Sequence, residues 1–354
     1  MSLIHRLDTC ENATVTPPTY LSFFTASSSI LITIVASVGN SLLIIAVIWD
    51  PYKDLRIPFN YFLVNLSIAD LVVGLILGPL STIFHMLEGH NKLKSSFKDA
   101  VYVTYFTLCA TSLLSLTALG LDRYFAIIHP LSYRANLKPI RVLLISVLLW
   151  IVSILLSMIY FIVGYNRFRF IFANTAVAVT IIELIFTNTK ILKHLQHHIQ
   201  QWGDLQENTE EDLIMMRLMI WEKKMTKTLV IAIFMLLAIY LPSCIFIYII
   251  NLCTNCDCMF IHWIRDIQWL LVMTTSAVNP FVYAWRLENF RRVLKSIVTC
   301  HPCIRSNQNH YQPLWTVNGL NKATPARKME FISWYRGHYV DAQASKPKSR
   351  TYTK

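Results

Sequence analysis

The sequence predicts an all-α protein, a seven-transmembrane helix bundle that ends in a short amphipathic eighth helix. Two observations predict this fold class. The chain is 55% hydrophobic and only 15% charged, whereas soluble globular chains carry about a quarter charged residues. It also contains seven apolar runs, each long enough to cross ~30 Å of hydrocarbon as a helix. The runs are residues 21–49, 57–87, 100–121, 142–165, 170–189, 228–253 and 267–285.

Basic residues predict the orientation of these spans. The first 19 residues contain Arg6 but no apolar core, so we expect no cleavable signal peptide. With the N-terminus outside, only seven of the 32 Lys and Arg residues lie in outer segments, in keeping with the positive-inside rule. The glycosylation acceptor Asn12, in "NAT", then lies outside. We therefore expect a plasma-membrane protein with an extracellular N-terminus and a cytoplasmic C-terminus.

The remaining segments give the domain organisation. We expect an extracellular segment over residues 1–22, one membrane domain over 23–298 and a disordered cytoplasmic tail over 299–354. The longest inner loop, residues 195–225, is expected to be a polar, solvated segment. The net charge of +12 lies mostly on the inner side. It should attract anionic membrane lipids, and no nucleic-acid partner is expected.

Cysteines cluster in "NLCTNCDCMF", which this topology places outside. A disulfide is favoured there over a zinc site completed by His262, because an outer loop is oxidising. The disulfide candidates are Cys253, Cys256, Cys258 and Cys10. Two cysteines after the amphipathic helix, Cys300 and Cys303, are candidates for palmitoylation.

Asp70 lies deep inside the second span. A charge at that depth costs a few kcal/mol or more, so Asp70 is a functional candidate. Polar residues of other spans at comparable depth could join it to hold water or a sodium ion; the alternative is a protonated, structural Asp70. These residues are Asn40, Ser112, Thr275, Ser276 and Asn279. Pro242 and Pro280 are expected to kink their helices, and Tyr283 lies one turn beyond the second kink.

Asp122 and Arg123 stand side by side in "ALGLDRYFAII", where the third span ends. Glu222 lies at the start of the sixth span, at the predicted inner surface. If the third and sixth helices are neighbours there, Glu222 could also pair with Arg123. Breaking such a partly buried pair costs a few kcal/mol, which suits a switch between two states.

These features occur together in a known family. Gly39 followed by Asn40, "LSIAD", "LDRY", Trp150, Pro242 and "NPFVY" with the following amphipathic helix resemble the rhodopsin-like, class A, G-protein-coupled receptors over residues 24–300. Several usual residues are replaced, by Lys98, Thr180, Asn188, Leu236 and Tyr240. The missing outer disulfide, missing span-five proline and cysteine-bearing third outer loop resemble the melanocortin, cannabinoid, lysophospholipid and adenosine receptors.

The resemblance implies a receptor, not an enzyme, that binds an extracellular ligand and activates a heterotrimeric G protein. Arrestin-type regulators at the tail are implied as further partners, and an allosteric sodium ion is the only implied cofactor. The residues implied for coupling and switching are Asp122, Arg123, Tyr124, Glu222, Asn279, Pro280 and Tyr283, with Pro130 and Tyr133 in the second inner loop. Those implied for the sodium pocket are Asp70, Asn40, Ser112, Ser276 and Asn279.

The sequence gives less information about the class of ligand. Tyr105 stands where amine receptors have an aspartate, and Met273 where opsins have the retinal lysine. Leu80 and Tyr102 stand where melanocortin receptors have acids. The inferred ligand pocket is Tyr102, Tyr105, Tyr240, Ile247, Trp269 and Met273. This aromatic set favours a lipid or hydrophobic small molecule, although it could equally be packed core; a peptide ligand and a constitutively active orphan receptor stay open.

A membrane transporter or channel is the competing class. It would need buried polar residues across the whole bilayer, and the third, fourth and sixth spans are nearly without charge. No internal repeat is visible either, which disfavours transporters built from duplicated halves. The receptor is therefore the favoured interpretation.

Overall fold

A computed structural model describes residues 17–50, 55, 58–129, 133, 139–203, 210–253, 256–286 and 288–298. All regular structure within these ranges is helical, and they contain no strand. The predicted all-α class is thus confirmed.

The helices follow the predicted order of spans. The first span is α2 (Thr19–Trp49), and the second comprises α3 (Pro58–Val72), the π-helical turn η1 (Val73–Leu77) and α4 (Gly78–Gly89). The third is α5 (Ser95–Ile128), and the fourth is α7 (Pro139–Met158) with α8 (Tyr160–Val163). The fifth comprises α9 (Tyr165–Phe172), the π-helical turn η2 (Ala173–Val177) and α10 (Ala178–Gly203). Then come α11 (Glu210–Leu252), α12 (Cys258–Arg286) and α13 (Glu288–Val298).

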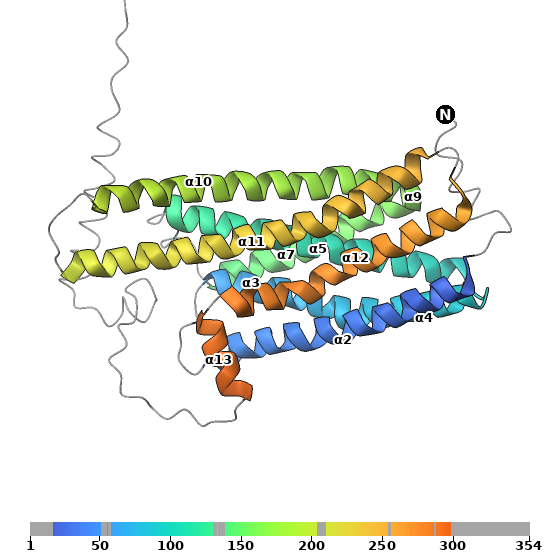
Figure 1. The fold of residues 1–354 in the computed structure, drawn as a ribbon, viewed down its shortest axis with the longest axis horizontal. Coiled ribbons are helices and arrows are strands. Elements are labelled where there is room, and N and C mark those ends of the chain that lie inside the picture. The colour runs from blue at the N-terminus through green and yellow to red at the C-terminus, as the bar shows by residue number, and fades with distance from the viewer. Residues whose placement is uncertain are drawn as a thin grey trace, which may run out of the picture. The chain divides into compact units, whose positions relative to one another are not determined.

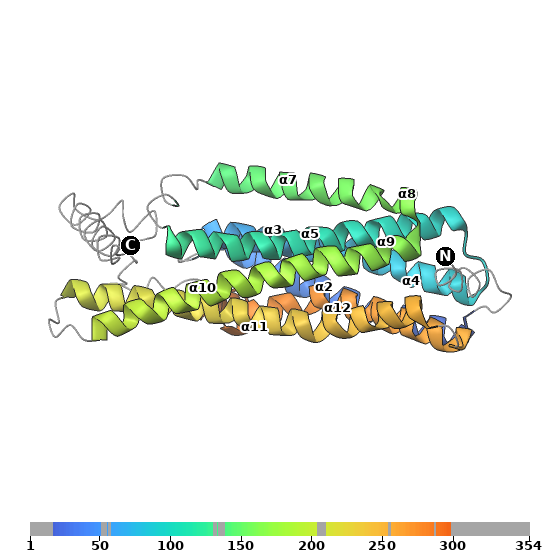
Figure 2. The same cartoon turned by 90° about the horizontal axis from the view of Figure 1, so that it is seen from above.

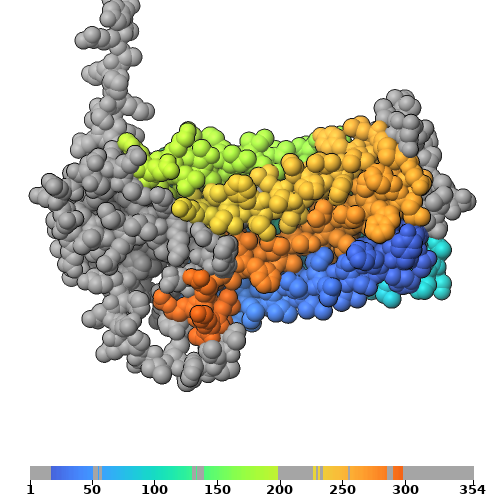
Figure 3. Space-filling view, viewed as in Figure 1, coloured from blue at the N-terminus to red at the C-terminus, as the bar shows by residue number. Residues whose placement is uncertain are grey.

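The seven spans run side by side along a common direction, and α13 crosses them (Figures 1 and 2). α5 packs against α3, α7 and α10, while α11 packs against α10 and α12. α2 packs against α4 and α12, so α12 lies between α11 and α2 on the face in Figure 3. The amphipathic α13 buries Phe290 and Val293 and packs against α2 and α12.

Apolar side chains cover the outside of the bundle. Leu144, Leu148 and Leu155 of α7 are each more than half exposed, and Ile162 of α8 is 84% exposed. Six of the helical spans in the described ranges are long and apolar enough to cross a membrane. The seventh, α12, has 29 residues but carries charged side chains near its start. Hydrocarbon, rather than water, suits such an exterior, and the chain is a multi-pass membrane protein.

Three boundaries differ from the prediction. The expected polar loop over 195–225 is largely helical, because α10 continues to Gly203 and α11 begins at Glu210. Residues such as Gln, Glu, Leu and Met favour helix there, and the backbone needs no hydrocarbon to continue it. The fifth span begins at Tyr165, directly after Gly164, whose φ of 79° is a conformation that favours glycine. α12 begins at Cys258, so two charged residues that we counted as loop lie inside the helix.

The contact between α2 and α4 depends on a glycine. A Cβ atom placed on Gly78 would lie 1.8 Å from Oγ1 and 2.9 Å from Cβ of Thr33. Rotation of Thr33 would relieve the first contact but not the second, so the two helices can be this close only with glycine at position 78.

We expect Gly78→Ala to destabilise the bundle by about 1–3 kcal/mol, the usual cost of overpacking a tight contact. Thermal unfolding of the purified protein in detergent would measure it. Gly89→Ala, in the same helix, is the matched control, because its nearest contact would be Cβ of Ser22 at 3.3 Å. Equal melting temperatures for the two variants would show that α2 and α4 can move apart freely.

Candidate functional site

At one end of α5, Arg123 is held within its own helix and by Tyr133. We call this the Arg123 end of the bundle. The Nε and Nη2 atoms of Arg123 donate to Oδ2 of Asp122 at 3.0 and 2.7 Å. The hydroxyl of Tyr133 donates to Oδ1 of Asp122 at 2.7 Å and lies 3.4 Å from Nη2 of Arg123. The guanidinium also lies over the Phe59 ring, 4.7 Å from its centroid. Arg123 is therefore buried, neutralised and fixed in place.

Of the other predicted switch residues near Asp122 and Arg123, the structure describes only some. Tyr124 packs against a cluster of Ile127, Ile191 and Leu195 that joins α5 to α10. Glu222 lies on α11, but its side chain is outside the described part of the chain. Pro130 also lies outside the described residues, so a contact between Glu222 and Arg123 stays a prediction.

Asp70 forms a polar cluster in the bundle interior with the residues proposed from the sequence. Ser112 donates to its Oδ1 at 3.1 Å, and Asn279 donates to its Oδ2 at 2.7 Å. Ser276 also forms a side-chain hydrogen bond with Asp70. Asn40 donates instead to the Ser276 carbonyl at 3.0 Å, and its own Oδ1 has no partner. The cluster thus joins α2, α3, α5 and α12.

Two predicted residues of α12 lie beside this cluster in the chain. The Pro280 ring is buried, and a Cβ atom on Gly39 would lie 3.1 Å from it, so glycine allows close packing of α12 on α2. Tyr283 is fully buried, and its hydroxyl has no hydrogen-bond partner. A buried hydroxyl without a partner is costly, which favours its pairing in another state of the protein.

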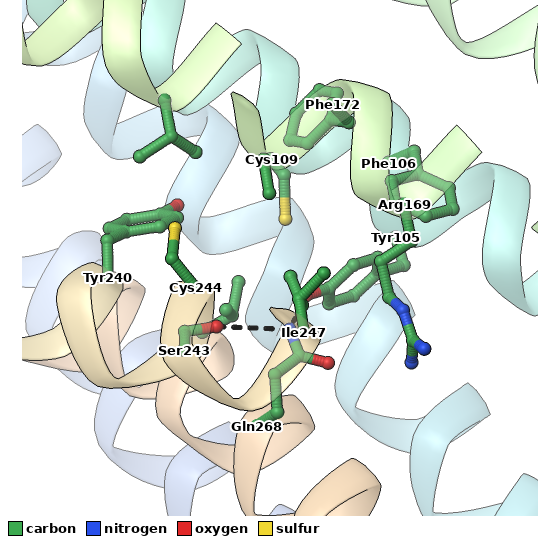
Figure 4. A pocket seen from close by; sticks show the side chains of 13 residues that line it. Tyr105, Phe106, Cys109, Arg169, Phe172, Tyr240, Ser243, Cys244, Ile247 and Gln268 are labelled. Carbon is green, nitrogen blue, oxygen red and sulfur yellow. Dashed lines mark hydrogen bonds between the residues drawn. The ribbon is translucent and has the colours of Figure 1, made fainter. Parts of the chain in front are cut away.

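The other end of the bundle, which we call the Cys253 end, contains a pocket (Figure 4). It has about 320 Å³ of empty space, open solvent included. Gln268 donates to the Tyr105 hydroxyl and to Oγ of Ser243, each at 3.2 Å. The lining residues are Tyr105, Phe106, Cys109, Arg169, Phe172, Ala173, Val177, Tyr240, Ser243, Cys244, Ile247, Gln268 and Val272.

Three of the six residues predicted for the ligand pocket line this pocket. Tyr105, Tyr240 and Ile247 line it, but Tyr102, Trp269 and Met273 do not. Tyr102 stacks on Tyr165, with 3.9 Å between ring centroids, and Trp269 stacks on Tyr105 at 4.4 Å. The Trp269 indole also donates to Ser81 at 2.8 Å, which turns it toward α4. The phase of α12 explains this difference, because Gln268 and Val272, four residues apart, face this pocket.

Sequence reasoning missed Arg169, a charged residue of the pocket wall. We counted it among outer basic residues, but the helix that begins at Tyr165 places it on an inward face with Ala173 and Val177. Its side chain is buried. These three positions are four residues apart, so they share one face of a helix. This spacing would have indicated that Arg169 faces inward, had the helix been predicted to begin at Tyr165.

Sequence reasoning also missed a buried network of charges at the Cys253 end. Arg265 binds Glu88 of α4 and its neighbour Asp266, with N–O distances of 2.9 and 2.8 Å. Thr25 of α2 donates to Asp266 at 2.9 Å, and His85 Nε2 lies 3.9 Å from the same carboxylate. The network therefore ties α12 to α2 and α4.

The cysteines of the third outer loop form disulfides. Cys253 and Cys256 are joined, and Cys258 is disulfide-bonded as well. The other residues proposed for modification or pairing lie outside the described residues: Cys10, Asn12, Cys300 and Cys303.

Comparison with known proteins shows similarity to one receptor family. Residues 39–175 match the seven-transmembrane receptor family of the rhodopsin type. A tachykinin-like peptides receptor of Drosophila melanogaster is 28% identical over 345 residues, which cover 88% of this chain and 66% of that receptor. The family match covers less than half of the chain, and it shows that residues 39–175 are similar to the rhodopsin family of seven-transmembrane receptors.

Further receptors match shorter segments of the chain. An octopamine receptor of Heliothis virescens is 35% identical over 41% of this chain and 30% of its own length. The human histamine H2 receptor is 37% identical over 39% of this chain and 36% of its own length. The chain thus spans about a third to two thirds of these relatives. None of their names supports the narrower melanocortin, cannabinoid, lysophospholipid or adenosine group, which stays a prediction.

In this helix bundle, we expect Arg265→Met to cost about 3–5 kcal/mol of stability, because it leaves two buried carboxylates without their cation. Thermal unfolding would measure the loss. Arg167→Met, which removes an exposed arginine, is the control and should have little effect. Equal behaviour of the two variants would show that Glu88 and Asp266 are neutralised without Arg265.

Proposed function

We propose that the protein is a plasma-membrane receptor that binds a small ligand at the Cys253 end and activates a heterotrimeric G protein at the Arg123 end. The arrangement of Asp122, Arg123 and Tyr133 carries this proposal. A buried arginine paired within its own helix can change partner when neighbouring helices move, with little loss of charge compensation. The Arg123 end is the cytoplasmic end in the predicted orientation.

The distribution of basic residues supports the same assignment of ends. Most Lys and Arg residues fall in segments at the Arg123 end and in the tail. A basic inner face suits anionic lipids and the acidic surfaces of cytoplasmic partners. An arrestin-type regulator at residues 299–354 is part of this proposal.

The pocket supports a small hydrophobic ligand. Its walls are mainly aromatic and aliphatic, with a few polar groups that could fix orientation. Relatives are named for octopamine, histamine and tachykinin-like peptides. Recognition of a buried amine would require an acidic partner, and none of the thirteen lining residues is acidic.

The cluster around Asp70 suits a sodium ion, which prefers oxygen ligands. Asp70 supplies a carboxylate, Ser112 and Ser276 supply hydroxyl oxygens, and the Asn40 Oδ1 is a further acceptor without a partner. A bound cation would neutralise the carboxylate. These residues would then hold α2, α3, α5 and α12 together in one state of the receptor.

Asp122→Asn should raise basal nucleotide exchange several-fold, because the neutral amide no longer holds the Arg123 guanidinium. The measurement is GTPγS binding to a panel of G-protein subtypes in membranes with matched receptor levels. Asp99→Asn is the control: Asp99 lies on the same helix and accepts a hydrogen bond from Tyr160 at 2.6 Å, but far along the chain from Arg123. Unchanged basal exchange across the panel would contradict the proposed restraint.

Sodium should raise the melting temperature of the purified receptor relative to equal concentrations of choline, and Asp70→Asn should abolish the difference. Removal of the carboxylate removes the only formal charge among the proposed ligands. Glu183→Gln, which removes another acid of a span, is the control. Sodium sensitivity that survives Asp70→Asn would place the ion elsewhere.

A further inference from the structure

Arg169 is buried in the pocket wall with most of its hydrogen-bonding capacity unused. Its residue is only 2% exposed, and its Nε and Nη2 atoms have no hydrogen-bond partner. Its one hydrogen bond among the described residues runs from Nη1 to the Tyr165 hydroxyl at 3.4 Å. The guanidinium carbon also lies 4.9 Å from the centroid of that ring. Neither contact supplies a negative charge.

A buried guanidinium in this condition is costly. Arginine stays protonated in proteins, so it cannot lower the cost by losing its charge. Two other arginines show the usual solution: the buried Arg123 and the partly buried Arg265 each contact carboxylates. Among the residues that line the pocket, none can do the same for Arg169. A bound anion would supply the negative charge that the residues lining the pocket lack.

The unused atoms define the shape of that anion. Nε and Nη2 form one edge of the planar guanidinium. This edge can donate two parallel hydrogen bonds to two oxygens of a carboxylate or phosphate. Figure 4 shows Arg169 on the pocket wall together with Tyr105, Ile247 and Gln268. The Gln268 amide and the Tyr105 hydroxyl are polar groups of the same pocket, while Phe106, Phe172 and Val272 supply apolar walls.

We propose that the pocket binds a small amphiphilic anion whose carboxylate or phosphate group pairs with Nε and Nη2 of Arg169 and whose apolar body lies against the aromatic wall. This inference rests on the proposed receptor function for the role of the ligand, but not for its binding. The proposed pocket thus prefers an anion, whereas an amine site prefers a cation.

The first test needs no ligand. Arg169→Met should raise the melting temperature of the ligand-free receptor by about 2–4 °C, because it removes an uncompensated buried charge and keeps the apolar volume. Arg265→Met is the matched control: it removes a partly buried arginine that has carboxylate partners, so the melting temperature should fall. A fall for Arg169→Met like that of Arg265→Met would overturn the proposal, because it would show a protein partner for Arg169.

The second test measures binding on the purified receptor, without a G protein. Small aromatic and aliphatic monocarboxylates, each beside its primary amide and its phosphonate, are compared by thermal shift and by displacement of a bound acid. Some acids should stabilise the wild type, their amides should bind at least tenfold more weakly, and Arg169→Met should remove the difference. Phosphonates that bind more tightly than the matched carboxylates would identify a phosphate-bearing ligand.

Two results would overturn the proposal: no acid that binds better than its amide, or an equal preference in Arg169→Met. Acid binding without any effect on nucleotide exchange would instead contradict the proposed receptor function and leave the anion site standing.

Discussion

The structure depends on one constraint: a charge buried among apolar helices needs a partner of opposite charge. At the Arg123 end the partner comes from the adjacent residue of α5, so the pair can move with its helix. At the Cys253 end Arg265 draws its partners from α4 and α12, so the pair fixes helices to each other. The bundle is thus tied by charges at one end and carries a self-contained charge pair at the other, an arrangement that allows motion mainly at the Arg123 end.

α12 connects the pocket to the polar interior. Gln268 and Val272 line the pocket, Asn279 binds Asp70, and Tyr283 follows one turn later. Because these side chains project from one continuous helix, a small rotation or shift of α12 at the pocket changes the surroundings of Asp70. The Tyr283 hydroxyl, buried and without a partner here, is the group in this path that gains most from such a rearrangement.

The sequence predicts the helices and the Asp70 cluster because both depend on strong local costs. A run of apolar residues, and a lone acid within it, can be recognised in the sequence without knowing which helices pack together. Trp269, predicted for the ligand pocket, contacts Ser81 and Tyr105 instead of lining this pocket, because the direction of a side chain depends on helix phase and packing partners. Arg265 and Arg169 were missed because charges near the end of an apolar run are ordinarily solvated, and only the packed helices reveal their burial.

Arg123 and Arg169 are physically alike but differ in the source of compensation. Asp122 accompanies Arg123 permanently, so a partner protein must compete with an intramolecular carboxylate that is always present. Arg169 has no such competitor among the pocket residues, so an incoming anion gains the full benefit of neutralising it. A buried guanidinium therefore restrains the bundle at the Arg123 end, whereas the guanidinium in the pocket is ready to bind an anion. A ligand anion would stabilise the inward position of α9. The same span continues as α10 toward the Arg123 end.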